Sequence, residues 1–93
     1  MGRCIIADDG ALINWIDALS GRHGAARAPS VSEWKRLWHG NQTEESLAGG
    51  RFMWVNGMND HEVIVVFTPY KGLDFNLTFS VLSGELLKIE EAR

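Results

Sequence analysis

In the second half of the chain, hydrophobic and polar residues alternate with a period close to two. Four segments show this alternation from residue 51 onward, and short stretches rich in Gly, Asn, Asp, Lys and Ser separate them. Because successive side chains of a β-strand point to opposite faces, these segments predict strands, and the short turns predict antiparallel neighbours. We expect a four-stranded antiparallel β-meander over about residues 51–91, with strands in RFMWVNG, EVIVVFTPY, DFNLTFSVL and ELLKIEEA.

The last turn of this meander allows a choice of register. A three-residue loop that ends at Gly84 sets Phe79 opposite Leu87 and Leu77 opposite Ile89, whereas a two-residue loop pairs apolar with charged residues. The longer loop also places the glycine at the left-handed position that such loops require. We therefore predict the three-residue loop.

The second predicted strand is apolar on both faces, because Ile64 and Val66 alternate with three further apolar residues. Its second face needs a cover. We expect an intramolecular cover, from the RCIIA segment or from the loop around Tyr70. The alternative is a contact patch, formed with residues of FMWV, for a partner or for a second copy of the chain.

The first half of the chain follows a helical period. After RCIIA, which fits a short edge strand, Asp8 and Asp9 offer a helix N-cap. The apolar residues of ALINWIDAL then sweep an arc of about 200° on a helical wheel, which predicts a deeply buried helix to about Ser20. The segment GRHGAARAP is predicted to be a loop.

Two further helices are predicted before the meander. SVSE has the spacing of a capping box, with Ser30 as cap, Glu33 as its partner and Ser32 as a competing cap. This helix should run to about His39, and TEESLAGG should form a short helix capped by Thr43. The fold class is therefore α+β, with two to three N-terminal helices packed on one face of the meander. We expect a single domain over residues 1–93, with a helical half at about 8–48.

The tryptophans of SVSEWKRLWHGN occupy one side of their predicted helix. Val31, Trp34, Leu37 and Trp38 fall within an arc of about 120°, which is typical of a packing stripe. Basic residues follow its edge and the preceding loop. They form one candidate surface: Arg22, Arg27, Lys35, Arg36 and His39.

Charge and cysteine content narrow the possible functions. Nine basic and twelve acidic residues give a net charge of -3, which argues against general nucleic-acid binding. The basic surplus lies within residues 22–51, and acidic residues prevail on either side. Cys4 is the only cysteine, so no intramolecular disulfide is possible, and this fits a reducing cytoplasm. We expect no signal peptide and no membrane anchor.

No motif in the chain indicates catalysis. Cys4, His23, His39 and His61 are scattered without the short spacings of zinc sites, and no G-x-S-x-G nucleophile motif is present. We therefore expect no catalytic residue, no metal and no cofactor.

The turns of the meander instead combine aromatic, amide and acidic side chains, a mixture typical of recognition surfaces. The candidate partner-binding residues are Trp54, Asn56, Met58, Asp60, His61, Glu62 and Asp74. The leading hypothesis is a non-catalytic protein that inhibits a basic partner protein by occlusion, of the toxin-immunity or phage-inhibitor class. The alternatives are a homodimeric structural or regulatory subunit that pairs through the second face of the sheet, and a small ligand-binding or enzymatic domain that uses His and Arg.

Overall fold

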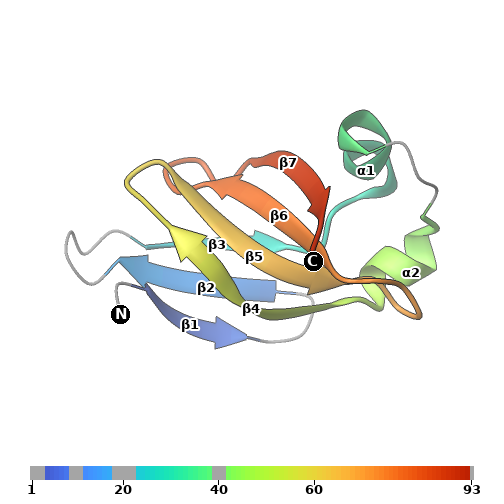
Figure 1. Ribbon diagram of the computed structural model, residues 1–93, viewed down its shortest axis with the longest axis horizontal. Helices are drawn as coiled ribbons and strands as arrows, with labels where there is room; N and C mark the ends of the chain where they lie inside the picture. Colours follow the sequence, from blue (N-terminus) through green and yellow to red (C-terminus); the bar gives the residue numbers. More distant parts are fainter. Residues whose placement is uncertain (1–3, 9–11, 18–22, 39–41, 93) are drawn as a thin grey trace.

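The computed structural model describes residues 4–8, 12–17, 23–38 and 42–92. Within them the chain forms two antiparallel sheets, with two short helices between the sheets in sequence (Figure 1). The first sheet has the order β1 (Cys4–Asp8), β2 (Leu12–Asp17), β3 (His23–Arg27). The helices are α1 (Val31–Leu37) and α2 (Glu44–Ala48). The second sheet has the order β4 (Arg51–Met58), β5 (Glu62–Thr68), β6 (Phe75–Ser80), β7 (Leu86–Glu91).

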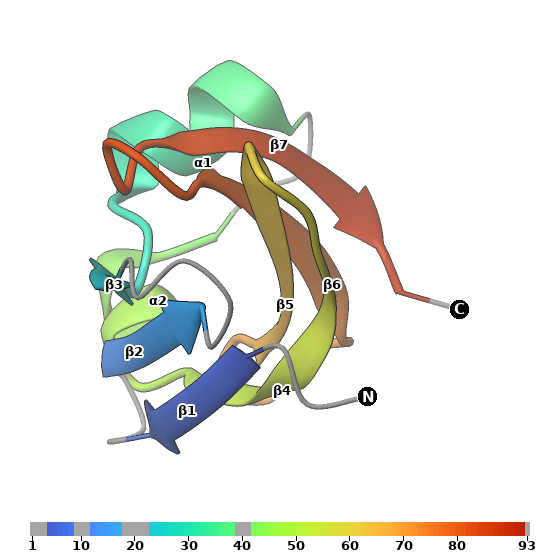
Figure 2. The ribbon, with the colours of Figure 1, turned by 90° about the vertical axis from the view of Figure 1, so that its left-hand side faces the viewer.

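The larger sheet is strongly curved. Figure 2 shows its concave side turned toward the smaller sheet and the helices, and β1 and β4 contact each other where the two sheets meet. α1 contacts β7 at the opposite edge of the larger sheet. None of the helices in the described residues is long and apolar enough to cross a membrane.

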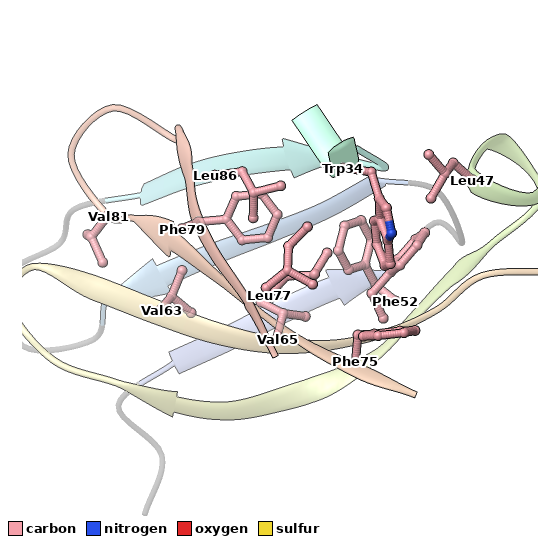
Figure 3. Packing of buried hydrophobic residues seen from close by; sticks show 12 residues of the cluster. Trp34, Leu47, Phe52, Val63, Val65, Phe75, Leu77, Phe79, Val81 and Leu86 are labelled. Carbon is pink, nitrogen blue, oxygen red and sulfur yellow. The ribbon is translucent and has the colours of Figure 1, made fainter. Parts of the chain in front are cut away.

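The core lies on the concave side of the larger sheet (Figure 3). Residues of all four strands point into it, and α1 and α2 each add one fully buried side chain, Trp34 and Leu47. Removing apolar side chains of this size from water contributes about 1.5–3 kcal/mol each, so this cluster contributes strongly to stability. Its described members are Trp34, Leu47, Phe52, Val63, Val65, Phe67, Phe75, Leu77, Phe79, Val81, Leu86 and Ile89.

The predicted meander is confirmed in its bounds and its strand order. The last hairpin agrees in part with the predicted register. Leu77 pairs with Ile89 as expected, and Gly84 has the predicted positive φ, at 76°. Phe79, however, pairs with Leu86, because a β-bulge shifts the register after Thr78. The prediction that Phe79 faces Leu87 was therefore wrong, and the Leu87 side chain is 40% exposed.

The predicted helix at about residues 9–20 was also wrong. Its described part is strand β2, which pairs with β1 and β3 on its two sides. The segment is rich in β-branched and aromatic residues, and cross-strand pairing on both edges outweighs its helical period. The predicted loop GRHGAARAP contains strand β3. RCIIA does supply an edge strand, β1, but in the smaller sheet.

The two helices before the meander are confirmed. Ser30 caps α1 in a capping box with Glu33, and Thr43 caps α2 in the same way with Ser46. α1 ends at Leu37, earlier than expected, and His39 lies outside the described residues. With its antiparallel meander and its short helices, the chain has an α+β architecture.

Candidate partner-binding face

The four-stranded sheet has a second side that points away from the core, which we call the outer face. Figure 2 shows no described helix or strand over this convex side. Strand pairing and the alternation with core residues assign its members. They are Arg51, Trp54, Asn56, Glu62, Ile64, Val66, Thr68, Asn76, Thr78, Ser80, Lys88 and Glu90.

Trp54 is the largest exposed side chain of the outer face, with 52% of its surface accessible. Val66 lies between Trp54 and Asn76 in the ladder and is only 1% exposed, and Ile64 is half-buried. Val66 is thus shielded within the chain, but no described helix or strand lies over the second face of β5, so the expected cover by RCIIA is not observed. In the loop that was the other expected cover, the Tyr70 side chain is 60% exposed. The apolar patch open to a partner on the outer face consists mainly of Trp54.

Two polar pairs lie on the outer face, one near Trp54 and one on β7 at the opposite edge of the sheet. Asn56 donates a hydrogen bond from Nδ2 to Oδ1 of Asn76 over 3.1 Å, and Lys88 Nζ lies 3.7 Å from Glu90 Oε2. Both pairs are exposed, so each contributes little to stability. The Asn56–Asn76 pair holds amide groups in defined positions near the aromatic side chain of Trp54, a mixture typical of binding surfaces.

A tight turn closes one end of the outer face. The Oδ1 atom of Asn59 accepts hydrogen bonds from the backbone N–H groups of His61 and Glu62, each over 2.8 Å. The β6–β7 loop lies beside this turn, since the N–H of Val81 donates to the carbonyl of His61 over 2.9 Å. The two loops bring together three exposed carboxylates, which we call the acidic end: Asp60, Glu62 and Glu85.

Asp74 lies at the other end of the sheet. Its Oδ1 accepts a hydrogen bond from Thr68 Oγ1 over 2.6 Å. Thr68 is the last residue of β5 and Glu62 is its first, so about 20 Å of extended chain separates Asp74 from the acidic end.

The structure therefore brings together most of the predicted partner-binding residues, but not all of them. Trp54, Asn56 and Glu62 share the outer face, Asp74 is bonded to its far end, and Asp60 and His61 are exposed in the adjoining turn. Met58 does not belong to this surface. It pairs with Val63 and packs against the core, so it lies apart from Trp54 and Asn56.

The second candidate surface is divided. Lys35 and Arg36 are exposed on α1 and line an open cavity of about 430 Å³ with Trp38 and Ile89. Arg27 lines a separate cavity of about 260 Å³ between β3 and the two helices. Arg22 and His39 lie outside the described residues.

Four apolar residues outside the predicted partner-binding set are also exposed. Met53, Tyr70, Leu73 and Leu82 each expose 47% or more of their surface, and the last three lie in turns. Tyr70, Leu73 and Leu82 could have been selected from the sequence, because they are apolar residues in or next to predicted turns. Among the described residues, no group of three or more His, Cys, Asp or Glu side chains could hold a metal ion.

Comparisons with models of protein families, with curated proteins and with solved structures found no match.

Proposed function

We propose that this chain is a non-catalytic binding protein that occludes a partner protein through its outer face. The observation that carries the proposal is Trp54, a large aromatic residue half-exposed on a regular antiparallel sheet, beside a fixed amide pair. Tryptophan is enriched among the residues that dominate binding energy, and a rigid support lowers the entropy cost of binding.

The charge of this surface favours a basic partner. The acidic end places three carboxylates next to the outer face, and the whole chain has a net charge of -3. Such a field would speed encounter with a positively charged protein and fix the orientation of the complex. We propose a cytoplasmic location, because a single cysteine suits a reducing compartment.

Inhibitors of the toxin-immunity or phage-encoded class act in this way, by covering a functional surface rather than by chemistry. A dimer through the same face is less well supported. With Val66 buried, Trp54 is the main exposed apolar side chain of the outer face, whereas homodimer interfaces are more apolar than other interfaces.

The test is capture of a partner from the native host with a tagged chain, in parallel with two variants. Trp54→Ala removes the proposed anchor, and Lys35→Gln is the matched control on α1, away from the outer face. We expect one stoichiometric protein with the wild type and with Lys35→Gln, identified by mass spectrometry. Trp54→Ala should weaken its binding by at least about 2 kcal/mol, or roughly thirtyfold.

Binding kinetics with the purified partner test the charge argument. The double variant Glu62→Lys and Glu85→Lys should lower the association rate at low salt and should leave it nearly unchanged at high salt. Capture that is equally strong with Trp54→Ala would contradict the proposal. A dimer at micromolar concentration that Trp54→Ala dissociates would favour the homodimer instead.

A further inference from the structure

A groove of about 310 Å³ opens beside the loop that follows β5, at the end of the sheet opposite the acidic end. Side chains from the α2–β4 junction, from β4 and from the β5–β6 loop line it. We call it the Tyr70 groove, and its lining residues are Gly49, Arg51, Met53, Thr68, Pro69, Tyr70, Lys71 and Asp74.

Hydrogen bonds hold the walls of this groove in place. The backbone N–H of Tyr70 donates to the carbonyl of Ser46 in α2 over 2.8 Å, and Gly72 N–H donates to the carbonyl of Pro69 over 2.9 Å. The bond from Thr68 to Asp74 closes the loop on itself. The groove is therefore formed before any ligand arrives, which lowers the cost of binding.

The groove exposes apolar surface. Met53 and Tyr70 are 47% and 60% exposed, and both line it. Met53 lies in a β-bulge between Phe52 and Trp54, so its side chain leaves the regular alternation of β4. Thioether and phenol side chains together offer an adaptable contact for one apolar side chain of a partner.

The groove carries a net positive charge. Arg51 and Lys71 are exposed, and in the described part of the chain neither forms an ion pair with a carboxylate. Lys71 Nζ lies 5.5 Å from the centre of the Tyr70 ring, so this cation borders the apolar wall. Asp74 is the one acidic residue of the lining, and Thr68 engages its carboxylate. Two cations against one bonded carboxylate leave the groove complementary to an anionic group.

We propose that the Tyr70 groove binds an acidic segment of a partner protein. One apolar side chain of that segment packs against Met53 and Tyr70, and flanking carboxylates face Arg51 and Lys71. A peptide fits better than a nucleic acid, because phosphate contacts need a more extended basic surface than two side chains on a chain of net charge -3. The groove shares Arg51 and Thr68 with the outer face, but this inference does not depend on Trp54, so the two proposals can fail independently.

The probe is the acetylated and amidated peptide EDLFDE, titrated into the full-length ¹⁵N-labelled chain and followed by NMR. We expect saturable shifts at the backbone amides of Arg51, Met53 and residues 70–72, with a Kd no weaker than about 5 mM. The uncharged peptide QNLFNQ and the basic peptide KKLFKK should leave these amides nearly unshifted. Shifts of equal size with KKLFKK, or no shift with EDLFDE, would overturn the proposal.

Two variants assign the effect to the groove. Arg51→Gln combined with Lys71→Asn removes both cations, and asparagine tolerates the positive φ of 60° at position 71. This double variant should weaken EDLFDE binding by about fivefold or more, whereas Lys88→Gln on the outer face should not change it. Trp54→Ala should also leave the peptide response intact, which separates this site from the one in the proposed function.

A thymidine oligonucleotide, titrated in place of the peptide, tests whether the groove binds nucleic acid. We expect it to leave the amides around Tyr70 unshifted. If it shifts them at lower concentration than the peptide does, the groove is a nucleic-acid contact and the proposal is wrong.

Discussion

The Trp34 indole meets the Phe75 ring nearly at a right angle, with the ring centroids 4.9 Å apart and the planes inclined by 84°. Trp38 approaches the same ring in the same manner, with the centroids 5.5 Å apart. Edge-to-face pairs of this kind are favourable beyond the area that they bury. One phenylalanine of β6 thus links both tryptophans of the α1 segment to the concave side of the sheet.

The two tryptophans should differ in their contribution to stability. Trp34 is fully buried, so Trp34→Ala should lower the free energy of unfolding by about 3–5 kcal/mol. Trp38 is half-buried, and Trp38→Ala should cost about 1–2 kcal/mol. Urea denaturation followed by circular dichroism measures both. Equal costs would show that the α1 segment does not pack as described.

The N-cap of α1 offers a second comparison. Ser30 Oγ accepts a hydrogen bond from Glu33 N–H over 3.1 Å, and Glu33 Oε1 accepts one from Ser30 N–H over 2.9 Å. Ser30→Ala should therefore cost about 1 kcal/mol of unfolding free energy. Ser32→Ala should cost less than about 0.5 kcal/mol, since Ser32 lies within the first turn and does not cap it. Thermal denaturation of the two variants measures both losses. A larger loss for Ser32→Ala than for Ser30→Ala would show that Ser30 is not the residue that caps α1.

Capping motifs and alternation predicted the chain from Ser30 onward well, because both are local signals. Serine or threonine three residues before a hydrogen-bonding partner specifies a helix start, and a period of two specifies strands between short turns. The bulge after Thr78 has no such signal. Leu86 and Leu87 are identical residues, so the sequence offers no reason for one rather than the other to face Phe79.

Strand β2 shows where hydrophobic periodicity fails to distinguish a strand from a helix. In LINWID the apolar residues cover so wide an arc that a helix and a strand explain them equally well. Pairing with β1 and β3 decides between them. The sequence of the segment alone does not indicate these contacts, because they involve other segments of the chain.

The candidate site was predictable in part for a similar reason. Alternation placed Trp54 and Glu62 on a strand surface, but the bulges of β4 determine where Met53 and Asn56 point. The Tyr70 groove joins two separate stretches of the chain, 49–53 and 68–74, so no single stretch of sequence indicates it.

Gly50 and Gly57 form a matched pair for a packing test. A Cβ atom at Gly50 would lie 2.5 Å from Phe67 Cζ and 2.9 Å from the carbonyl oxygen of Thr68, whereas one at Gly57 would meet nothing within 4 Å. Gly50→Ala should therefore lower the free energy of unfolding by about 1–3 kcal/mol. Gly57→Ala should stay within about 0.5 kcal/mol of the wild type. Chemical denaturation compares the two, and a tolerated Gly50→Ala would contradict the close approach of β5 at this position.

Asn59 should hold the acidic end in place, because its side-chain oxygen accepts two backbone hydrogen bonds. Asn59→Ala leaves both N–H groups to water, and we expect a loss of about 1–2 kcal/mol of unfolding free energy. Hydrogen exchange of the His61 and Glu62 amides should accelerate at least about tenfold.

Asn56→Ala is the control, since it removes one exposed bond between two amides and should cost less than about 0.5 kcal/mol. If Asn59→Ala leaves both amides as protected as in the wild type, the turn does not depend on this side chain. If it exposes them, the same variant should also slow association with a basic partner, because Asp60 and Glu62 would lose their defined positions.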